Sequence, residues 1–348
     1  MSKQSAIVIC PGRGTYGQSE LGYLAKNHAN STETGVFLEE LDAARESLDQ
    51  ISLSALDNSE RFQPRVHGTG DNASALIHAC AMADFKSIDL GQFDIVAVTG
   101  NSMGWYIALA CAGVLSDQAG FEVVNTMGTL MHMEGEGGQV IYPLVNAQWQ
   151  IDPALGRICD ETVAALNEQA GTAIHTSIDL GGMRVLAGNA NGVKALLANL
   201  PPQQDRFPFQ LQHHSAFHSP LLNHIPPMAK SSLGSALFKM ANLPLIDGRG
   251  KIWQPGAYTT SALYDYTFDH QITKTYDFSK ALEVSLKEFA PDKLIVLGPG
   301  TTLGPPVAQQ LIRLKWLGLE SKSEFSLRQE QDPFLLSMGI SNQRKKVV

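Results

Sequence analysis

The sequence contains few cysteines and few basic residues, and each shortage excludes a class of protein. The four cysteines stand far apart, at Cys10, Cys80, Cys111 and Cys159. No two of them have the spacing of a metal site or a redox pair, so we expect reduced, buried thiols and a cytoplasmic protein. The chain has 26 Lys and Arg against 34 Asp and Glu, a formal net charge of −8. This balance argues against a nucleic-acid partner, because nucleic-acid binding requires a basic surface.

Long apolar runs are also missing. The longest apolar stretch, 105–114, is far shorter than the roughly 20 residues that cross a bilayer. The run 6–10 near the amino end is too short for the apolar core of a secretory signal and leads directly into Pro11. We therefore expect no membrane partner.

What the chain does contain is enough apolar sequence for a folded protein of about two domains, with 44% hydrophobic residues in 348. Three short apolar runs, 6–10, 95–98 and 294–297, each lead into a glycine-rich turn, and such runs predict buried parallel strands. Ligands bind beyond the carboxyl ends of parallel strands, so we expect the three turns to line one crevice. Helical spacing over 37–48, and again after the candidate N-cap Ser116, predicts a doubly wound α/β layer structure.

The middle of the chain predicts a different unit. We expect strands over 139–145, 173–178, 183–187 and 207–211, and helices over 152–169 and 193–200. The order βαββαβ is that of a ferredoxin-like domain. We therefore predict a discontinuous large domain, 1–135 and 213–316, with 136–212 inserted as a small domain. The polar segment 317–348 is predicted to be a loosely attached C-terminal tail, with its basic cluster 344–346 in solvent.

The segment Gly100–Gly104 has the pattern G-x-S-x-G between an apolar strand and an apolar helix. Glycines at these positions permit a tight strand-to-helix turn that exposes the hydroxyl of Ser102 and directs the N–H groups of the helix toward it. Ser102 is therefore the candidate nucleophile. The alternative is a glycine turn whose serine only caps the helix.

A serine nucleophile needs a base, and His218 is the distinctive candidate among ten histidines. Pro220 disfavours helix in the residue before it, which places His218 near a loop or a helix start. His214 and His218 have the i, i+4 spacing of a metal site. That alternative is weak because no H-E-x-x-H glutamate lies between them and Pro220 opposes a continuous helix. A purely structural histidine stays possible.

A rival motif lies at Gly12–Gly17, where G-x-G-x-x-G follows the first strand as in dinucleotide-binding proteins. That fingerprint requires an acid at the end of a second strand, and Glu39 and Glu40 are at about the right distance. The helical spacing over 37–48 places these acids on a helix instead. Pro11 also removes a backbone donor where a phosphate would bind, so a nicotinamide-binding oxidoreductase is the less favoured alternative.

Five motifs, in order and spanning residues 5–312, resemble those of the malonyl-CoA:acyl carrier protein transacylases and of the acyltransferase domains of polyketide and fatty acid synthases. The matching segments are Pro11–Gly14 (P-G-R-G for P-G-Q-G), Gly100–Gly104 (G-N-S-M-G for G-H-S-x-G), Ala216–Leu221 (A-F-H-S-P-L), Gln271 and Leu297–Gly300. The resemblance implies a hydrolase-like α/β domain carrying a ferredoxin-like insert.

The resemblance also implies roles for individual residues. Ser102 would take an acyl group from acyl-CoA, with His218 as its base, and pass it to the phosphopantetheine thiol of an acyl carrier protein. Backbone N–H groups of Arg13 and Met103 would form the oxyanion hole. A backbone carbonyl of the segment around Gln271 would orient the histidine. Acyl-CoA and carrier protein are substrates in this scheme, and no bound metal or redox cofactor is expected.

The sequence departs from the family around the acyl pocket, to which we assign Asn101, Met127 and Phe217. The family's R-G-x-x-M pattern, whose arginine pairs with the malonate carboxylate, is M-G-T-L-M at 127–131. Methionine cannot pair with a carboxylate, so we expect a preference for uncharged acyl groups, unless Arg13 swings over the pocket. The expected function is an acyl-CoA:acyl carrier protein S-acyltransferase of fatty acid or polyketide biosynthesis. An acyl-thioester hydrolase and a non-catalytic scaffold for carrier proteins are the alternatives on the same fold.

Overall fold

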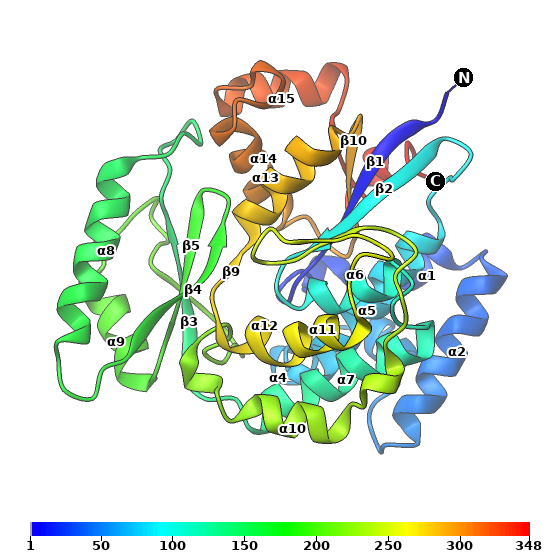
Figure 1. Cartoon of the computed structure of the whole chain (residues 1–348), viewed down its shortest axis with the longest axis horizontal. Helices are drawn as coiled ribbons and strands as arrows, with labels where there is room; N and C mark the ends of the chain where they lie inside the picture. Colours follow the sequence, from blue (N-terminus) through cyan, green and yellow to red (C-terminus); the bar gives the residue numbers. More distant parts are fainter. Residues whose placement is uncertain (1) are drawn as a thin grey trace.

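The structure, a computed structural model, describes residues 2–348, so residue 1, at which the predicted large domain begins, lies outside the described residues. The chain forms two sheets, each accompanied by helices, and the smaller unit with α8 and α9 lies beside the larger one (Figure 1). None of the helices in 2–348 is long and apolar enough to span a bilayer.

The large sheet has six strands in the order β11-β10-β1-β2-β7-β8. Its strands are β1 (Gln4–Cys10), β2 (Phe93–Gly100), β7 (Leu245–Ile246), β8 (Ile252–Trp253), β10 (Lys293–Val296) and β11 (Leu335–Ser337). All neighbours pair in parallel except β7 and β8, which are antiparallel. The three apolar runs are thus adjacent buried strands, as their composition predicts, with β1 between β10 and β2.

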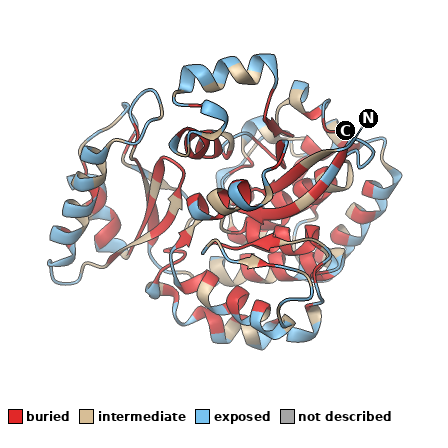
Figure 2. Ribbon diagram, turned by 45° about the horizontal axis from the view of Figure 1, so that its top comes forward, coloured by how far each residue is buried: buried red, intermediate tan, exposed pale blue. Residues whose placement is uncertain are grey.

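Helices pack on both faces of this sheet and turn their exposed sides outward (Figure 2). They are α1 (Tyr23–His28), α2 (Thr32–Glu46), α3 (Leu53–Asp57), α4 (Pro64–His67), α5 (Gly70–Lys86), α6 (Gly104–Cys111), α7 (Asp117–Met133), α10 (Ile225–Ser232), α11 (Thr260–Asp265), α12 (Gln271–Thr273), α13 (Phe278–Phe289), α14 (Gly304–Arg313), α15 (Lys322–Gln331) and α16 (Ser341–Arg344). Shorter helical segments are Gln18–Glu20, Pro220–Leu222, Ser235–Leu237, Tyr266–His270 and Trp316–Gly318. Ser116 caps α7 as expected, its side chain accepting from the N–H of Ala119. The helix predicted over 37–48 ends earlier, at Glu46, and Leu48 is exposed.

The small sheet has five strands in the order β6-β3-β5-β4-β9. Its elements are β3 (Gly138–Pro143), α8 (Pro153–Asn167), β4 (Ile174–Leu180), β5 (Met183–Gly188), α9 (Ala190–Asn199), β6 (Phe209–Leu211) and β9 (Tyr276–Asp277). The first six follow the order βαββαβ, so the unit is ferredoxin-like as predicted. The strand β9 comes from a later segment and pairs in parallel with β4, which ties the small sheet to the large domain. The expected fold class, a hydrolase-like doubly wound α/β domain with a ferredoxin-like insert, is confirmed.

The prediction of a loose tail over 317–348 is wrong. The strand β11 extends the large sheet by pairing in parallel with β10, and the guanidinium of Arg344 is buried against the carboxylate of Asp84 on α5. The same carboxylate accepts from the Tyr23 hydroxyl at 2.7 Å and from the N–H of Gly298 at 2.8 Å. The polar composition of this segment suggested a solvent-exposed tail. The ion pair of Arg344 joins it to Asp84, 260 residues away, and such a distant contact has no local sequence pattern.

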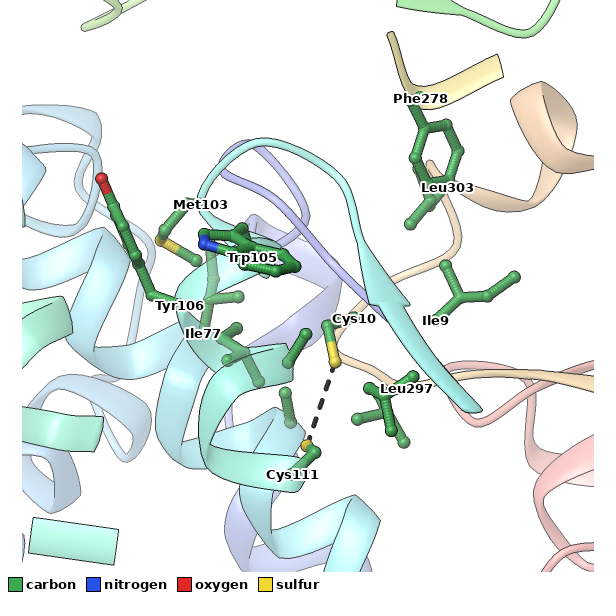
Figure 3. Packing of buried hydrophobic residues seen from close by; sticks show 14 of the residues in the cluster. Ile9, Cys10, Ile77, Met103, Trp105, Tyr106, Cys111, Phe278, Leu297 and Leu303 are labelled. Atoms are coloured by element: carbon green, nitrogen blue, oxygen red, sulfur yellow. Dashed lines mark hydrogen bonds between the residues drawn. The ribbon is translucent and has the colours of Figure 1, made fainter. Parts of the chain in front are cut away.

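All four cysteines are buried free thiols. Cys10 at the end of β1 and Cys111 at the end of α6 lie with their sulfur atoms 3.9 Å apart, in the apolar core that also holds Trp105 (Figure 3). Burial raises the pKa of the Cys10 thiol well above its usual value. These thiols behave as small apolar side chains, which supports the sequence-based interpretation.

The buried pair of Arg344 and Asp84 makes the C-terminal segment part of the core. We expect Arg344→Ala to lower the free energy of unfolding by about 3 kcal/mol, because it leaves a buried carboxylate without its cation. Urea denaturation followed by circular dichroism measures this change. Lys345→Ala, at an exposed neighbouring position, is the control and should change stability by about 0.5 kcal/mol at most. Equal effects of the two variants would contradict a structural role for the C-terminal segment.

Candidate active site

Ser102 lies in the turn between β2 and α6, with a positive backbone φ of 56°. The turn packs so closely on β1 that a Cβ on Gly104 would lie 2.3 Å from the carbonyl oxygen of Cys10. A Cβ on Gly100 would likewise lie 2.2 Å from the carbonyl oxygen of Gly104. The two glycines of the motif are therefore required by backbone contact, and together they hold Ser102 in a strained, half-buried conformation.

His218 lies in the loop after β6, just before the short helix at Pro220–Leu222, and it also has a positive φ of 55°. Its Nε2 lies 2.7 Å from Oγ of Ser102, and its Nδ1 lies 2.6 Å from the backbone oxygen of Gln271. Since a carbonyl can only accept, Nδ1 carries the proton in this arrangement. The bare Nε2 then accepts from the Ser102 hydroxyl, which is the geometry of a nucleophile and its base.

Burial lowers the pKa of His218 from its ordinary value to about 4, although the hydrogen bond to Gln271 acts in the opposite direction. The imidazole is therefore neutral at neutral pH and able to accept a proton. No carboxylate orients it, since the backbone oxygen of Gln271 takes that place.

Gln271 contacts both members of the pair, His218 through its backbone oxygen and Ser102 through its side chain, and the side-chain contact was not predicted from the sequence. Its Nε2 donates to the backbone oxygen of Ser102 at 3.1 Å, and its Oε1 accepts from the Tyr106 hydroxyl at 2.9 Å. The Tyr276 hydroxyl also donates to the backbone oxygen of Gly100 at 2.6 Å. Tyr106 and Tyr276 come from α6 and β9, and no local pattern marks either of them as part of a site.

Two backbone donors without a protein acceptor lie beside the nucleophile. Arg13 and Met103 both line the cavity that contains Ser102, and within residues 2–348 neither backbone N–H donates to a protein acceptor. The loop of Arg13 approaches the turn closely, because a Cβ on Gly12 would lie 2.7 Å from the backbone oxygen of Asn101. This geometry fits an oxyanion hole, for which unpaired and preorganised donors are needed.

A small cavity of about 40 Å³ adjoins Ser102 and His218. Its remaining wall comes from α5, α6, α7, α12 and two loops, and is formed by Arg13, Ser74, Met103, Tyr106, Val124, Met127, Gly128, Met131, Phe217, Gln271 and Ile272. Met127 and Phe217, both predicted for an acyl pocket, belong to this wall. Asn101 does not, because the turn at Ser102 directs it toward Gly12, into the larger cavity.

That larger cavity, of about 610 Å³, lies between the two sheets and also reaches Ser102. All three glycine turns contribute to its lining, through Gly12, Asn101 and Thr301 among others, which confirms that they share one crevice. The opposite wall is the face of the small sheet, with Ile141, Ile178, Leu180, Met183, Val185, Phe209 and Leu211.

The fold is shared along nearly the whole chain with solved malonyltransferases. The acyl-carrier-protein S-malonyltransferase of Burkholderia pseudomallei 1710b superimposes with a TM-score of 0.74 at 15% identity, covering 98% of each chain. The malonyl-CoA:ACP transacylase of Synechocystis sp. PCC 6803 has a TM-score of 0.71 at 17% identity, covering 99% of this chain and 100% of that one. This chain has the malonyl-CoA:acyl carrier protein transacylase fold.

A further solved chain with this fold is a malonyl-transacylase in complex with its type II polyketide synthase acyl-carrier protein. Its TM-score is 0.69 at 18% identity, covering 99% of this chain and 98% of that one. None of the known family profiles matches the sequence.

Sequence comparison connects the transacylase fold of this chain with polyketide synthases. The non-reducing polyketide synthase CTB1 of Cercospora beticola is 26% identical over 299 residues, which are 85% of this chain and 13% of the synthase. The 6-methylsalicylic acid synthase of Penicillium expansum is 29% identical over 161 residues, 44% of this chain and 8% of the synthase. The chain thus spans a small part of these relatives. Together with the solved structures, they confirm the resemblance seen in the five motifs.

The two alternative motifs, the glycine turn Gly12–Gly17 and the pair His214 and His218, do not form the sites that their patterns suggest. The glycine turn Gly12–Gly17 leads only into the three-residue helical segment Gln18–Glu20, since α1 begins at Tyr23, and Glu39 and Glu40 lie on α2. His214 lines the larger cavity, with Nδ1 2.8 Å from Oε1 of Gln139, and makes no hydrogen bond to His218. Neither motif has the local structure that its alternative function requires.

The low pKa of His218 makes a specific pH dependence testable. We expect the rate at which a fluorophosphonate probe labels Ser102 to change by about twofold at most between about pH 7.5 and 5.5, since a base with a pKa of about 4 stays neutral there. Labelling is measured by intact-protein mass, with Ser102→Ala as the blank and circular dichroism to verify the fold at each pH. A fall of about tenfold centred near pH 6.5, the ordinary histidine value, would contradict the buried, neutral base.

Proposed function

We propose that this chain is an acyl-CoA:acyl carrier protein S-acyltransferase that works through an acyl-serine intermediate. The observation that carries the proposal is the hydrogen-bonded series from Ser102 Oγ through His218 to the backbone oxygen of Gln271, at the junction of the two cavities. The fold and the polyketide synthase relatives support it, since the solved structures that share the fold are named as malonyltransferases and transacylases.

In the first half of the proposed reaction, Ser102 Oγ attacks the thioester carbonyl of acyl-CoA while Nε2 of His218 takes the hydroxyl proton. The backbone N–H groups of Arg13 and Met103 stabilise the oxyanion, and donors of this kind each contribute roughly a hundred- to thousandfold in rate. The C–S bond then breaks, the CoA sulfur receives the proton from His218, and the acyl group stays on Ser102.

In the second half, the phosphopantetheine thiol of a carrier protein gives its proton to His218 and attacks the acyl-serine. The C–O bond breaks, and Ser102 Oγ recovers its proton from His218. The larger cavity, open to Ser102 and lined by the small sheet, has the position and size to admit the phosphopantetheine arm. The reaction changes no oxidation state and every proton passes through His218, so the proposal includes no metal and no redox cofactor.

Hydrolysis of the acyl-serine is the second candidate function, and the same cavity favours it. About 610 Å³ of space reaching Ser102 admits water once CoA has left, and water in place of the carrier thiol releases the free acid.

We also propose that the acyl group is short and that the small cavity selects it. About 10–15 Å³ of space holds one water, so the small cavity of about 40 Å³ accepts a few non-hydrogen atoms at most. Met127 gives the α7 wall no cation, so we propose that this wall selects the acyl group by size and shape and not by charge.

Mass spectrometry of the intact protein tests the reaction. We expect brief exposure to short-chain acyl-CoA donors to add one acyl group to the chain but none to Ser102→Ala, and the adduct to move to phosphopantetheinylated carrier protein when this is added. An adduct that decays to free acid at the same rate with or without carrier establishes the hydrolase. If no donor labels Ser102, the acyltransferase proposal is wrong and a non-catalytic scaffold is favoured.

The size of the cavity generates a second test. Met127→Ala enlarges the cavity without adding charge. We therefore expect the ratio of butyryl to acetyl loading to rise by roughly tenfold, which corresponds to the free energy of burying one or two additional methylenes. Relative rates of loading from the two CoA thioesters measure it. Leu314→Ala, at the end of α14 and outside the cavity, is the control. A ratio that is unchanged in Met127→Ala would place the acyl group elsewhere.

A further inference from the structure

The side chain of Arg13 lies beside the site to which the sequence analysis assigned its backbone N–H. Arg13 lines both the small cavity and the larger one, next to Ser102. The guanidinium carbon lies 5.7 Å from the centre of the Phe217 ring, and Phe217 forms part of the wall of both cavities. A cation is therefore present at the acyl site although α7 contributes none.

Most hydrogen-bonding capacity of this guanidinium is unused. Its Nη2 donates to the backbone oxygen of Gly68 at 3.0 Å, whereas its Nε is buried without an acceptor. Within residues 2–348, no carboxylate lies within 4.0 Å of it, in contrast to Arg344, which is paired with Asp84. Burial lowers the pKa of Arg13 to about 10, so the group is still charged at neutral pH. Arg13 is half-buried, and a charged guanidinium with free donors in such a position is incomplete without an anionic partner.

The anchor of this guanidinium lies beside the α7 wall. Gly68 precedes α5, and the first residue of α5, Gly70, packs on α7 so closely that a Cβ on it would lie 2.5 Å from the backbone oxygen of Gly128. Gly128 follows Met127, and both line the small cavity. Arg13, in the loop after β1, thus places a positive charge beside this cavity. On the α7 side of the same cavity, Met127 stands where the resembling family has an arginine.

We propose that the guanidinium of Arg13 binds the carboxylate of a short, acid-bearing acyl group such as malonyl. The inference rests on the proposed acyltransferase function and names its substrate class. A carboxylate supplies the two acceptors that the free donors of Arg13 can engage together, which an acetyl or propionyl group cannot do. We expected uncharged acyl groups because Met127 cannot pair with a carboxylate. Arg13 supplies the positive charge that position 127 does not.

Asp71 is the acid whose charge acts on this arginine. It attracts the guanidinium and raises the pKa of Arg13. It forms no ion pair with Arg13, since no distance between them is within 4.0 Å, and its Oδ1 is buried without a partner. Asp71 also raises the pKa of Arg45, so its charge is shared between two arginines and does not neutralise Arg13 alone.

The test compares loading of Ser102 from malonyl-CoA and from acetyl-CoA in the whole chain. The informative variant is Arg13→Gln, which keeps the backbone N–H and installs the residue of the resembling P-G-Q-G motif. We expect its malonyl-to-acetyl ratio to fall by roughly 10- to 100-fold, the worth of hydrogen bonds to a charged group, and Arg13→Lys to recover part of it. Arg65→Gln removes the same charge from an exposed position on the neighbouring α4 and should leave the ratio unchanged.

Each outcome separates this inference from the proposed function. Loading of the native chain from acetyl-CoA but not from malonyl-CoA would overturn the role of Arg13 and leave the acyltransferase intact. An equal loss for both donors in Arg13→Gln would also overturn it, because a group that serves the oxyanion or CoA acts on every donor alike. Failure of every donor to load the native chain would instead contradict the proposed function itself.

Discussion

The close backbone contact between the nucleophile turn and β1 is the constraint on which the site depends. Gly104 lies against the carbonyl of Cys10, and Gly12 lies against the carbonyl of Asn101, so any side chain at either glycine would separate the turn from the strand. This contact fixes Ser102 at positive φ, and it brings the loop of Arg13 to the same point. The buried core beneath, with Trp105, Cys10 and Cys111, supports the turn from below (Figure 3).

The second half of the site is positioned by the connection between the two sheets. The segment after Gln271 forms β9, which pairs with β4 of the small sheet, and Gln271 itself contacts both Ser102 and His218. A polar backbone carbonyl can orient a histidine here because burial keeps the imidazole neutral, so no negative charge is needed to stabilise it in the resting state. Burial therefore explains both features of His218: it lowers the pKa of the imidazole, and the neutral imidazole needs a carbonyl and not a carboxylate as its partner.

Charge beside the small cavity comes from a loop and not from α7. Met127 gives α7 no cation there, whereas Arg13, more than 100 residues earlier in the chain, also lines this cavity. The two positions are close in space only because Gly70 lets α5 pack directly on α7 at Gly128. A specificity argument from one position of a motif is therefore incomplete until the whole wall is known.

The sequence by itself determined the three buried strands, the βαββαβ insert, the nucleophile turn and the identity of Ser102 and His218 as candidates, because strand composition and glycine turns are local properties. It did not determine the place of 317–348, whose strand and buried Arg344 depend on partners far away in the chain. It also placed Asn101 in the acyl pocket, whereas the turn directs that residue to the larger cavity. Only the tertiary structure brought the Tyr106 hydroxyl and the side-chain amide of Gln271 to the site and placed the Arg13 guanidinium beside Phe217. Packing between distant elements decides where long side chains end and which of their donors stay unpaired.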